Sequence, residues 1–188
     1  MPVAEVSLNE LSRRVGLAKS NVLRYFESRE AILLELLDRA WKQWIADLPD
    51  RLAAEVGEGG SMGERGDRLA TVLTRSLEER QVLCDLLSAQ AGVLERNLSA
   101  DLAGYWKRTA IGNVDAMARL MRHYLPELGD RAWILCAQAI MVAAAAWTHA
   151  RPSAAMLDAY DADPPWRRCA WTLPLPCRTC CPHWSPAP

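Results

Sequence analysis

Apolar residues recur every three or four positions along most of the chain, from Ser7 to about Arg151. This spacing matches the turn of an α-helix, and no stretch alternates apolar and polar residues as a half-buried strand does. The pattern therefore predicts an all-α protein. The expected helices span residues 7–16, 18–25, 28–48, 69–77, 82–94, 99–125 and 130–150, and the glycine-rich stretch 55–66 is an expected loop.

Residues that favour helix ends punctuate this pattern. Ser7 and Glu10 form a capping-box pattern, in which each side chain can accept a hydrogen bond from the other residue's free backbone N–H. Gly16 is expected to end the first helix, Ser28 to cap the third, and Pro49 to end the third. Two short helices followed by a long one are the outline of a helix-turn-helix with a linker helix.

The composition is that of a folded protein with a sizeable core. The chain has 188 residues, of which 51% are hydrophobic and 24% are charged, which suits one generous domain or two small ones. This balance excludes a disordered or collagen-like protein. The apolar stretch 133–147 is rich in alanine and is interrupted by Gln138, so it predicts a buried helix and not a membrane span. Because no export signal is visible at the start, we expect a cytoplasmic protein without a membrane partner.

The charge pattern adds a candidate surface for nucleic acid. The net charge is −1, so DNA binding requires a local basic patch, and residues 11–29 supply one with five basic side chains and one acidic side chain. On periodicity and charge alone, this region is either a DNA-binding surface or an ordinary helical hairpin with a solvated basic face. The side chains that project from the second helix, away from Val22, can bond phosphates and base edges; they are Lys19, Ser20, Asn21, Arg24 and Tyr25.

Residues 7–33, SLNELSRRVGLAKSNVLRYFESREAIL, resemble the DNA-binding motif of TetR-type transcriptional regulators. The family pattern is a helix that ends in Gly, a Val-Ser-Lys-type start of the second helix, an aromatic-rich second helix that ends in Phe, and Ser-Lys-Glu at the opening of the linker helix. Gly16, Phe26 and Ser28-Arg29-Glu30 stand at the corresponding positions here. Leu23 stands where the family usually has tyrosine, and it can pack on a thymine methyl group. The resemblance implies base-edge contacts from Lys19, Ser20, Leu23 and Tyr25, and phosphate contacts from Asn21, Arg24 and Arg29.

The same resemblance implies a function and its partners. A member of this family is expected to bind a double-stranded DNA operator, usually as a repressor, and to be released by a small apolar or aromatic effector. The last two helices of each subunit are expected to form a homodimer interface, with the alanine-rich helix 130–150 as the first of the pair. The implied organisation is a DNA-binding segment over residues 1–28, a helical ligand-binding and dimerisation domain over 29–163, and a tail over 164–188.

Both ends of the chain depart from the family. Family members carry one more helix before the motif, whereas six residues precede Ser7, and we interpret this as a start codon placed too late. Seven of the 11 prolines and no acidic residue follow Asp163, which we interpret as a reading-frame slip and a disordered or loosely packed tail. The tail contains possible zinc ligands, namely Cys169, Cys177, Cys180, Cys181 and His183. A structural zinc site is not expected, because the second pair of ligands at the usual spacing is absent. Disulfides are not expected in the cytoplasm either.

These departures leave an alternative open. A chain without its first helix and with an altered last helix could be a helical ligand-binding or oligomerising module that no longer binds DNA. An enzyme is not expected, because no glycine-rich phosphate loop is present and the histidines show no metal-binding spacing. Cys84 and Cys136 lie in apolar helix sequence and are expected to be inert core thiols, and no cofactor or metal is expected.

The effector pocket is expected among the helices of residues 32–150. Soft apolar side chains near polar groups suit a small apolar or aromatic molecule, although for the aromatic and Met residues we favour the interpretation that they are plain core. The candidates are Gln90, Trp106, Asn113, Met117 and Met121.

Overall fold

The computed structural model describes residues 3, 6–14, 16, 18–57 and 59–163, and throughout these residues the regular structure is helical. The all-α prediction is therefore confirmed. The elements are α1 (Leu8–Arg14), α2 (Lys19–Val22), α3 (Arg29–Glu55), α4 (Met62–Glu78), α5 (Gln81–Ala89), a π-helical turn (Gln90–Leu94), α6 (Ala100–Tyr124), a 3-10 turn (Pro126–Leu128), α7 (Arg131–His149) and α8 (Ala154–Ala162). The predicted tail, with its cysteines and His183, lies outside the described residues.

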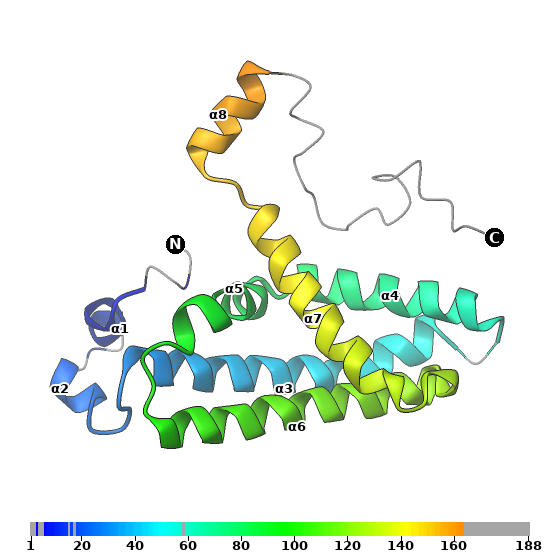
Figure 1. Ribbon diagram of the computed structural model, residues 1–188, viewed down its shortest axis with the longest axis horizontal. Helices are drawn as coiled ribbons and strands as arrows, with labels where there is room; N and C mark the ends of the chain where they lie inside the picture. Colours follow the sequence, from blue (N-terminus) through cyan, green and yellow to red (C-terminus); the bar gives the residue numbers. More distant parts are fainter. Residues whose placement is uncertain (1–2, 4–5, 15, 17, 58, 164–188) are drawn as a thin grey trace.

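Helix α3 forms the centre of the molecule. It packs against α4, α5 and α6, and α7 crosses over α5 and α6 (Figure 1). Helical spacing predicts an apolar stripe on residues 28–48 that includes Leu33, Leu37 and Trp44, and these three side chains are buried in this core, whereas Leu36 of the same stripe is exposed. Trp44, Leu48 and Leu52 are fully buried. Removing one such side chain from water stabilises the fold by roughly 1.5–3 kcal/mol. The Trp44 indole N–H also donates to Ser76 Oγ at 2.9 Å, so the most deeply buried ring leaves no polar atom unpaired.

The predicted cap at Ser28 is confirmed, and one of the two hydrogen bonds of the predicted Ser7–Glu10 capping box is present. Ser7 Oγ accepts from the backbone N–H of Glu10 at 3.1 Å, and Ser28 Oγ accepts from that of Ala31 at 3.1 Å. Ser99 caps α6 in the same way. These contacts are local in sequence, which is why the residue pattern alone predicted them.

Several predicted boundaries were wrong. Helix α3 continues through Pro49 to Glu55, because Leu52 and Val56 beyond the proline are buried in the core and hold the chain in helical register. The loop is shorter than 55–66, since a capping box between Ser61 and Glu64 starts α4 at Met62. The stretch 82–94 changes from an α-helix to a π-helical turn at Gln90.

The second predicted helix is also shorter than expected. We expected residues 18–25, but α2 covers only Lys19–Val22 and residues 23–25 form turns. Ala18, at the N-cap position of α2, has no side chain that could accept a hydrogen bond, so the helix start lacks the usual stabilisation.

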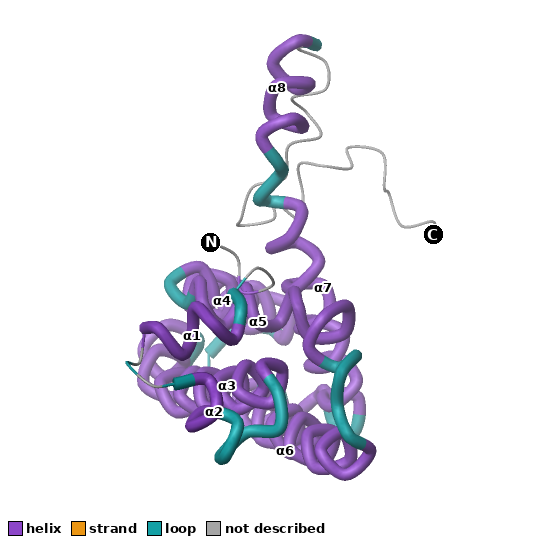
Figure 2. The backbone as a smooth tube through the Cα atoms, turned by 90° about the vertical axis from the view of Figure 1, so that its left-hand side faces the viewer, coloured by secondary structure: helices purple, strands orange, loops and turns teal. Residues whose placement is uncertain are grey.

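Helix α7 was expected to be covered on more than one side, but in the single chain only one side is covered. Ala132, Cys136 and Ile140 face the core, whereas a run of large apolar side chains is exposed, namely Trp133, Ile134, Leu135, Met141 and Val142. Among the described helices α7 is the one long and apolar enough to cross a membrane by length and composition, and the core helix of a soluble protein meets the same criteria. Helix α8, which the sequence pattern missed, has no buried residue and projects from the body (Figure 2).

Candidate DNA-binding surface and effector pocket

The two short helices α1 and α2 pack against each other at one end of the body (Figure 1). Gly16 has a φ of +67°, a conformation that side chains disfavour, and it turns the chain between the two helices. Val22 of α2 and Ser12 of α1 are buried in this small unit. The described residues therefore form the helix-turn-helix outline that the sequence predicted.

Six of the seven predicted DNA contacts lie at the surface. Their side chains are exposed in the described part of the chain, so they can reach a partner, and Tyr25 is 79% exposed. Opposite them, Val22 faces inward and fixes which side of the segment is presented. The exposed residues are Lys19, Ser20, Asn21, Leu23, Arg24 and Tyr25.

Arg29, the seventh predicted contact, is placed differently. Its guanidinium is half-buried, donates from Nη1 to the backbone oxygen of Val6 at 3.0 Å, and lies 3.2 Å from a carboxylate oxygen of Glu30. These contacts tie the start of α3 to the chain that precedes α1. A phosphate contact from Arg29 would have to share the guanidinium with this internal role.

A carboxylate links the candidate DNA-binding segment to the body. Glu27 Oε1 accepts from the backbone N–H of Ser99 at 3.0 Å, and Oε2 accepts from Ser99 Oγ at 2.9 Å. Ser99 is the N-cap of α6, so a negative charge lies at the positive end of that helix. Sequence reasoning missed this contact, because 72 residues separate its partners.

A second polar link joins α3 to α6. The buried carboxylate of Asp38 accepts from Asn113 Nδ2 at 2.9 Å and from Lys42 Nζ at 2.6 Å. These bonds explain why Asn113 and Asp38 can be buried without unpaired charge. They also hold α3, the linker helix, in register with α6.

Three of the five predicted effector residues line one cavity of about 250 Å³ between α3, α6 and α7. Gln90, Trp106 and Asn113 border it, together with Trp41, Ile140 and other apolar side chains. Met117 and Met121 are not among the lining residues; they lie in the closed core at 2% and 3% exposure. Their soft side chains fill space between helices that are already packed.

Glu95, which the sequence reasoning did not select, organises one wall of this cavity. Its carboxylate oxygen Oε1 accepts from Gln90 Nε2 at 2.8 Å and from the Trp106 indole at 3.2 Å. Burial opposes ionisation of Glu95, but these hydrogen bonds and the nearby charge of Lys107 outweigh it, so its pKa is lowered. The π-helical turn brings Gln90 and Glu95 together at this wall.

The two cysteines behave as the sequence predicted. Cys84 and Cys136 are buried and free, and burial raises the pKa of each thiol to about 11. A thiol with such a pKa is protonated at neutral pH and is a poor nucleophile or metal ligand.

Comparison with known families identifies the class of protein. The family model described as "Tetracyclin repressor-like, C-terminal domain" matches residues 38–179, which cover α3 from Asp38 onward and all the later helices. No curated protein is similar enough to count as a match. The chain belongs to the TetR family of transcriptional regulators.

Proposed function

We propose that the protein is a cytoplasmic DNA-binding repressor that is released from its operator by a small apolar or aromatic effector. The observation that carries this proposal is the surface of the DNA-binding segment, where Lys19, Arg24 and Tyr25 are exposed above the buried Val22. Cationic and hydroxyl side chains on one exposed face suit phosphate and base-edge contacts in a DNA groove.

The proposed repressor acts as a homodimer. The exposed apolar side chains of α7, such as Trp133 and Met141, form a face that needs a cover, and a second copy of the chain supplies a matching one. Pairing through α7 would set two DNA-binding segments at a fixed distance, as half-site recognition requires.

The proposed effector binds the cavity that Gln90, Trp106 and Asn113 border. A volume of about 250 Å³ suits a molecule of one or two rings, and tryptophan walls favour an aromatic one. Trp106 also borders a second cavity, which Phe26 of the DNA-binding segment lines as well. A ligand that moves the Trp106 ring therefore changes the packing beside Phe26. This shared side chain supports coupling between effector and DNA.

Fluorescence anisotropy with DNA from the gene's own upstream region tests the proposal, after sedimentation has measured the oligomeric state. We expect salt-sensitive binding, and we expect the double variant Lys19→Ala/Arg24→Ala to weaken it at least about tenfold. For this double variant, the slope of log affinity against log salt concentration should be shallower by about one unit for each phosphate contact that the substitutions remove. Arg119→Ala, which removes an exposed charge on α6, is the matched control and should leave affinity unchanged.

The opposite result supports the other function that the sequence left open. A folded dimer that shows no salt-dependent DNA binding would be a helical ligand-binding or oligomerising module. The four-residue length of α2 and the internal contacts of Arg29 are the observations that favour this second function.

A further inference from the structure

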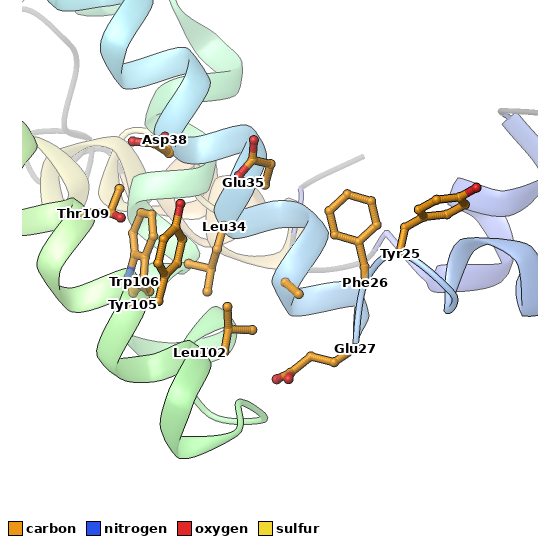
Figure 3. Close-up of a pocket in the computed structure, with 11 residues that line it drawn as sticks. Tyr25, Phe26, Glu27, Leu34, Glu35, Asp38, Leu102, Tyr105, Trp106 and Thr109 are labelled. Atoms are coloured by element: carbon orange, nitrogen blue, oxygen red, sulfur yellow. The ribbon is translucent and has the colours of Figure 1, made fainter.

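A second cavity, of about 300 Å³, lies at the junction between the DNA-binding segment and the body (Figure 3). Its walls come from residues 25–27, from α3 and from α6. It differs from the proposed effector pocket in all its lining residues except Trp106.

The charged side chains that line this junction cavity are acidic. Three carboxylates line it, from Glu27, Glu35 and Asp38, and its described lining residues include no lysine or arginine. Two of the three are neutralised from outside the cavity: Arg39 Nε lies 2.8 Å from Glu35, and Lys42 Nζ lies 2.6 Å from Asp38.

Glu27 differs from the other two carboxylates. Within the described residues its hydrogen-bond donors are the backbone N–H and the hydroxyl of Ser99, both of which are neutral. The cavity therefore retains one negative charge without a cationic partner in the described part of the chain.

The remaining walls are aromatic and aliphatic. Figure 3 shows the rings of Tyr105 and Trp106 on the α6 side and the ring of Phe26 on the side of the DNA-binding segment, whereas Tyr25 points away. Leu34 and Leu102 complete the apolar surface. Aromatic faces carry a negative quadrupole and attract cations, which adds to the effect of the carboxylate.

We propose that the junction cavity binds a planar aromatic molecule that carries one positive charge. The ring system packs between Phe26, Tyr105 and Leu34, and the cationic group lies toward Glu27. One carboxylate without a cationic partner among the described residues matches one ligand charge, and the volume suits two or three fused rings. This ligand class and this site are separate from the apolar effector of the interhelical pocket.

Calorimetric titration of the full chain, without DNA and at low salt, tests the site. The probes are N-methylquinolinium, a planar monocation, and 4-methylquinoline, which has the same shape and is neutral at mildly alkaline pH. We expect the cation to bind at least about tenfold more tightly than the neutral probe, because only the cation gains from Glu27 and the aromatic faces. Equal affinities, or no binding of either probe, would overturn the proposal.

Two variants locate the bound probe. Glu27→Gln keeps the shape of the side chain and should abolish the preference for the cation, whereas Asp67→Asn, the same charge change on α4, should preserve it. Tyr105→Leu should weaken cation binding by several-fold, and since Tyr105 is more than half exposed its loss leaves the core intact. A cation preference that survives Glu27→Gln would place the probe elsewhere. Because no DNA is present, failure here is independent of the repressor proposal.

Discussion

The candidate DNA-binding segment and the helical body of this protein differ in the contacts that stabilise each of them. In the body, α3 buries Trp44, Leu48 and Leu52 completely, and it packs against α4, α5 and α6. Among the described side chains of residues 6–28, Ser12 and Val22 are the buried ones. Polar contacts attach this segment to the body, of which the Glu27–Ser99 pair is the clearest.

This difference assigns the two regions different roles. A region with few buried apolar contacts opens locally at low free-energy cost, whereas a packed core opens only with the whole fold. The body is therefore expected to open only with the whole fold, whereas the segment is expected to open locally, because its position depends on contacts such as Glu27–Ser99.

The largest expected effect is a loss of stability in the helical body. Trp44→Ala removes a fully buried ring and leaves Ser76 Oγ without its indole donor, so the free energy of unfolding should fall by about 3–5 kcal/mol. Urea denaturation measures this change. The matched aromatic variant in the candidate DNA-binding segment, Tyr25→Ala, removes a ring that is 79% exposed. It should change the free energy of unfolding by no more than about 0.5 kcal/mol. Similar losses for both variants would contradict the contrast between the regions.

A smaller effect is expected where the two regions meet. Ser99→Ala removes both the N-cap of α6 and the hydroxyl that donates to Glu27, and should cost about 1 kcal/mol of stability. Hydrogen exchange should become faster in residues 6–28 as well as at the start of α6. Ser153→Ala removes the equivalent cap from α8 and serves as the control, because the Ser153 hydroxyl bonds to the backbone of its own helix. If the hydrogen-exchange rates of residues 6–28 are the same in both variants, the Ser99 contact does not stabilise the candidate DNA-binding segment.

The smallest effect concerns the dependence of stability on pH. Because the pKa of Glu95 is lowered in the folded state, its ionised form stabilises the fold above the ordinary pKa of a glutamate, and this contribution disappears as the pH falls through the lowered value. Glu95→Gln should therefore narrow the gap in stability between neutral and acidic pH. Denaturation series across this range measure the gap. An unchanged pH dependence would show that the bonds from Gln90 and Trp106 do not favour the charged form.

Local signals in the sequence predicted much of this structure. The spacing of Leu33, Leu37 and Trp44 predicted the buried face of α3, and Ser7 and Ser28 predicted their helix starts, because a cap and its partner lie three residues apart. The exposure of Lys19 and Arg24 also follows from the position of Val22 on a short helix. Contacts of this kind need no knowledge of distant segments.

Other features depended on residues far apart in the chain. The continuation of α3 past Pro49 follows from the burial of Leu52 and Val56 against other helices, which outweighs the local preference of proline to end a helix. Likewise, the closed packing of Met117 and Met121 could not be distinguished from a pocket lining by periodicity, since both positions face inward.

The sequence by itself determined the helical class, most helix starts, the exposed basic surface around Lys19 and Arg24, and the resemblance to the family, because each depends on spacing within one or two turns. Only the tertiary structure decided that Gln90, Trp106 and Asn113 share a cavity, that Glu27 reaches Ser99, and that α7 keeps an apolar face open. These features arise from helices that meet after folding. Their partners are distant in sequence, and no local pattern records how the helices pack.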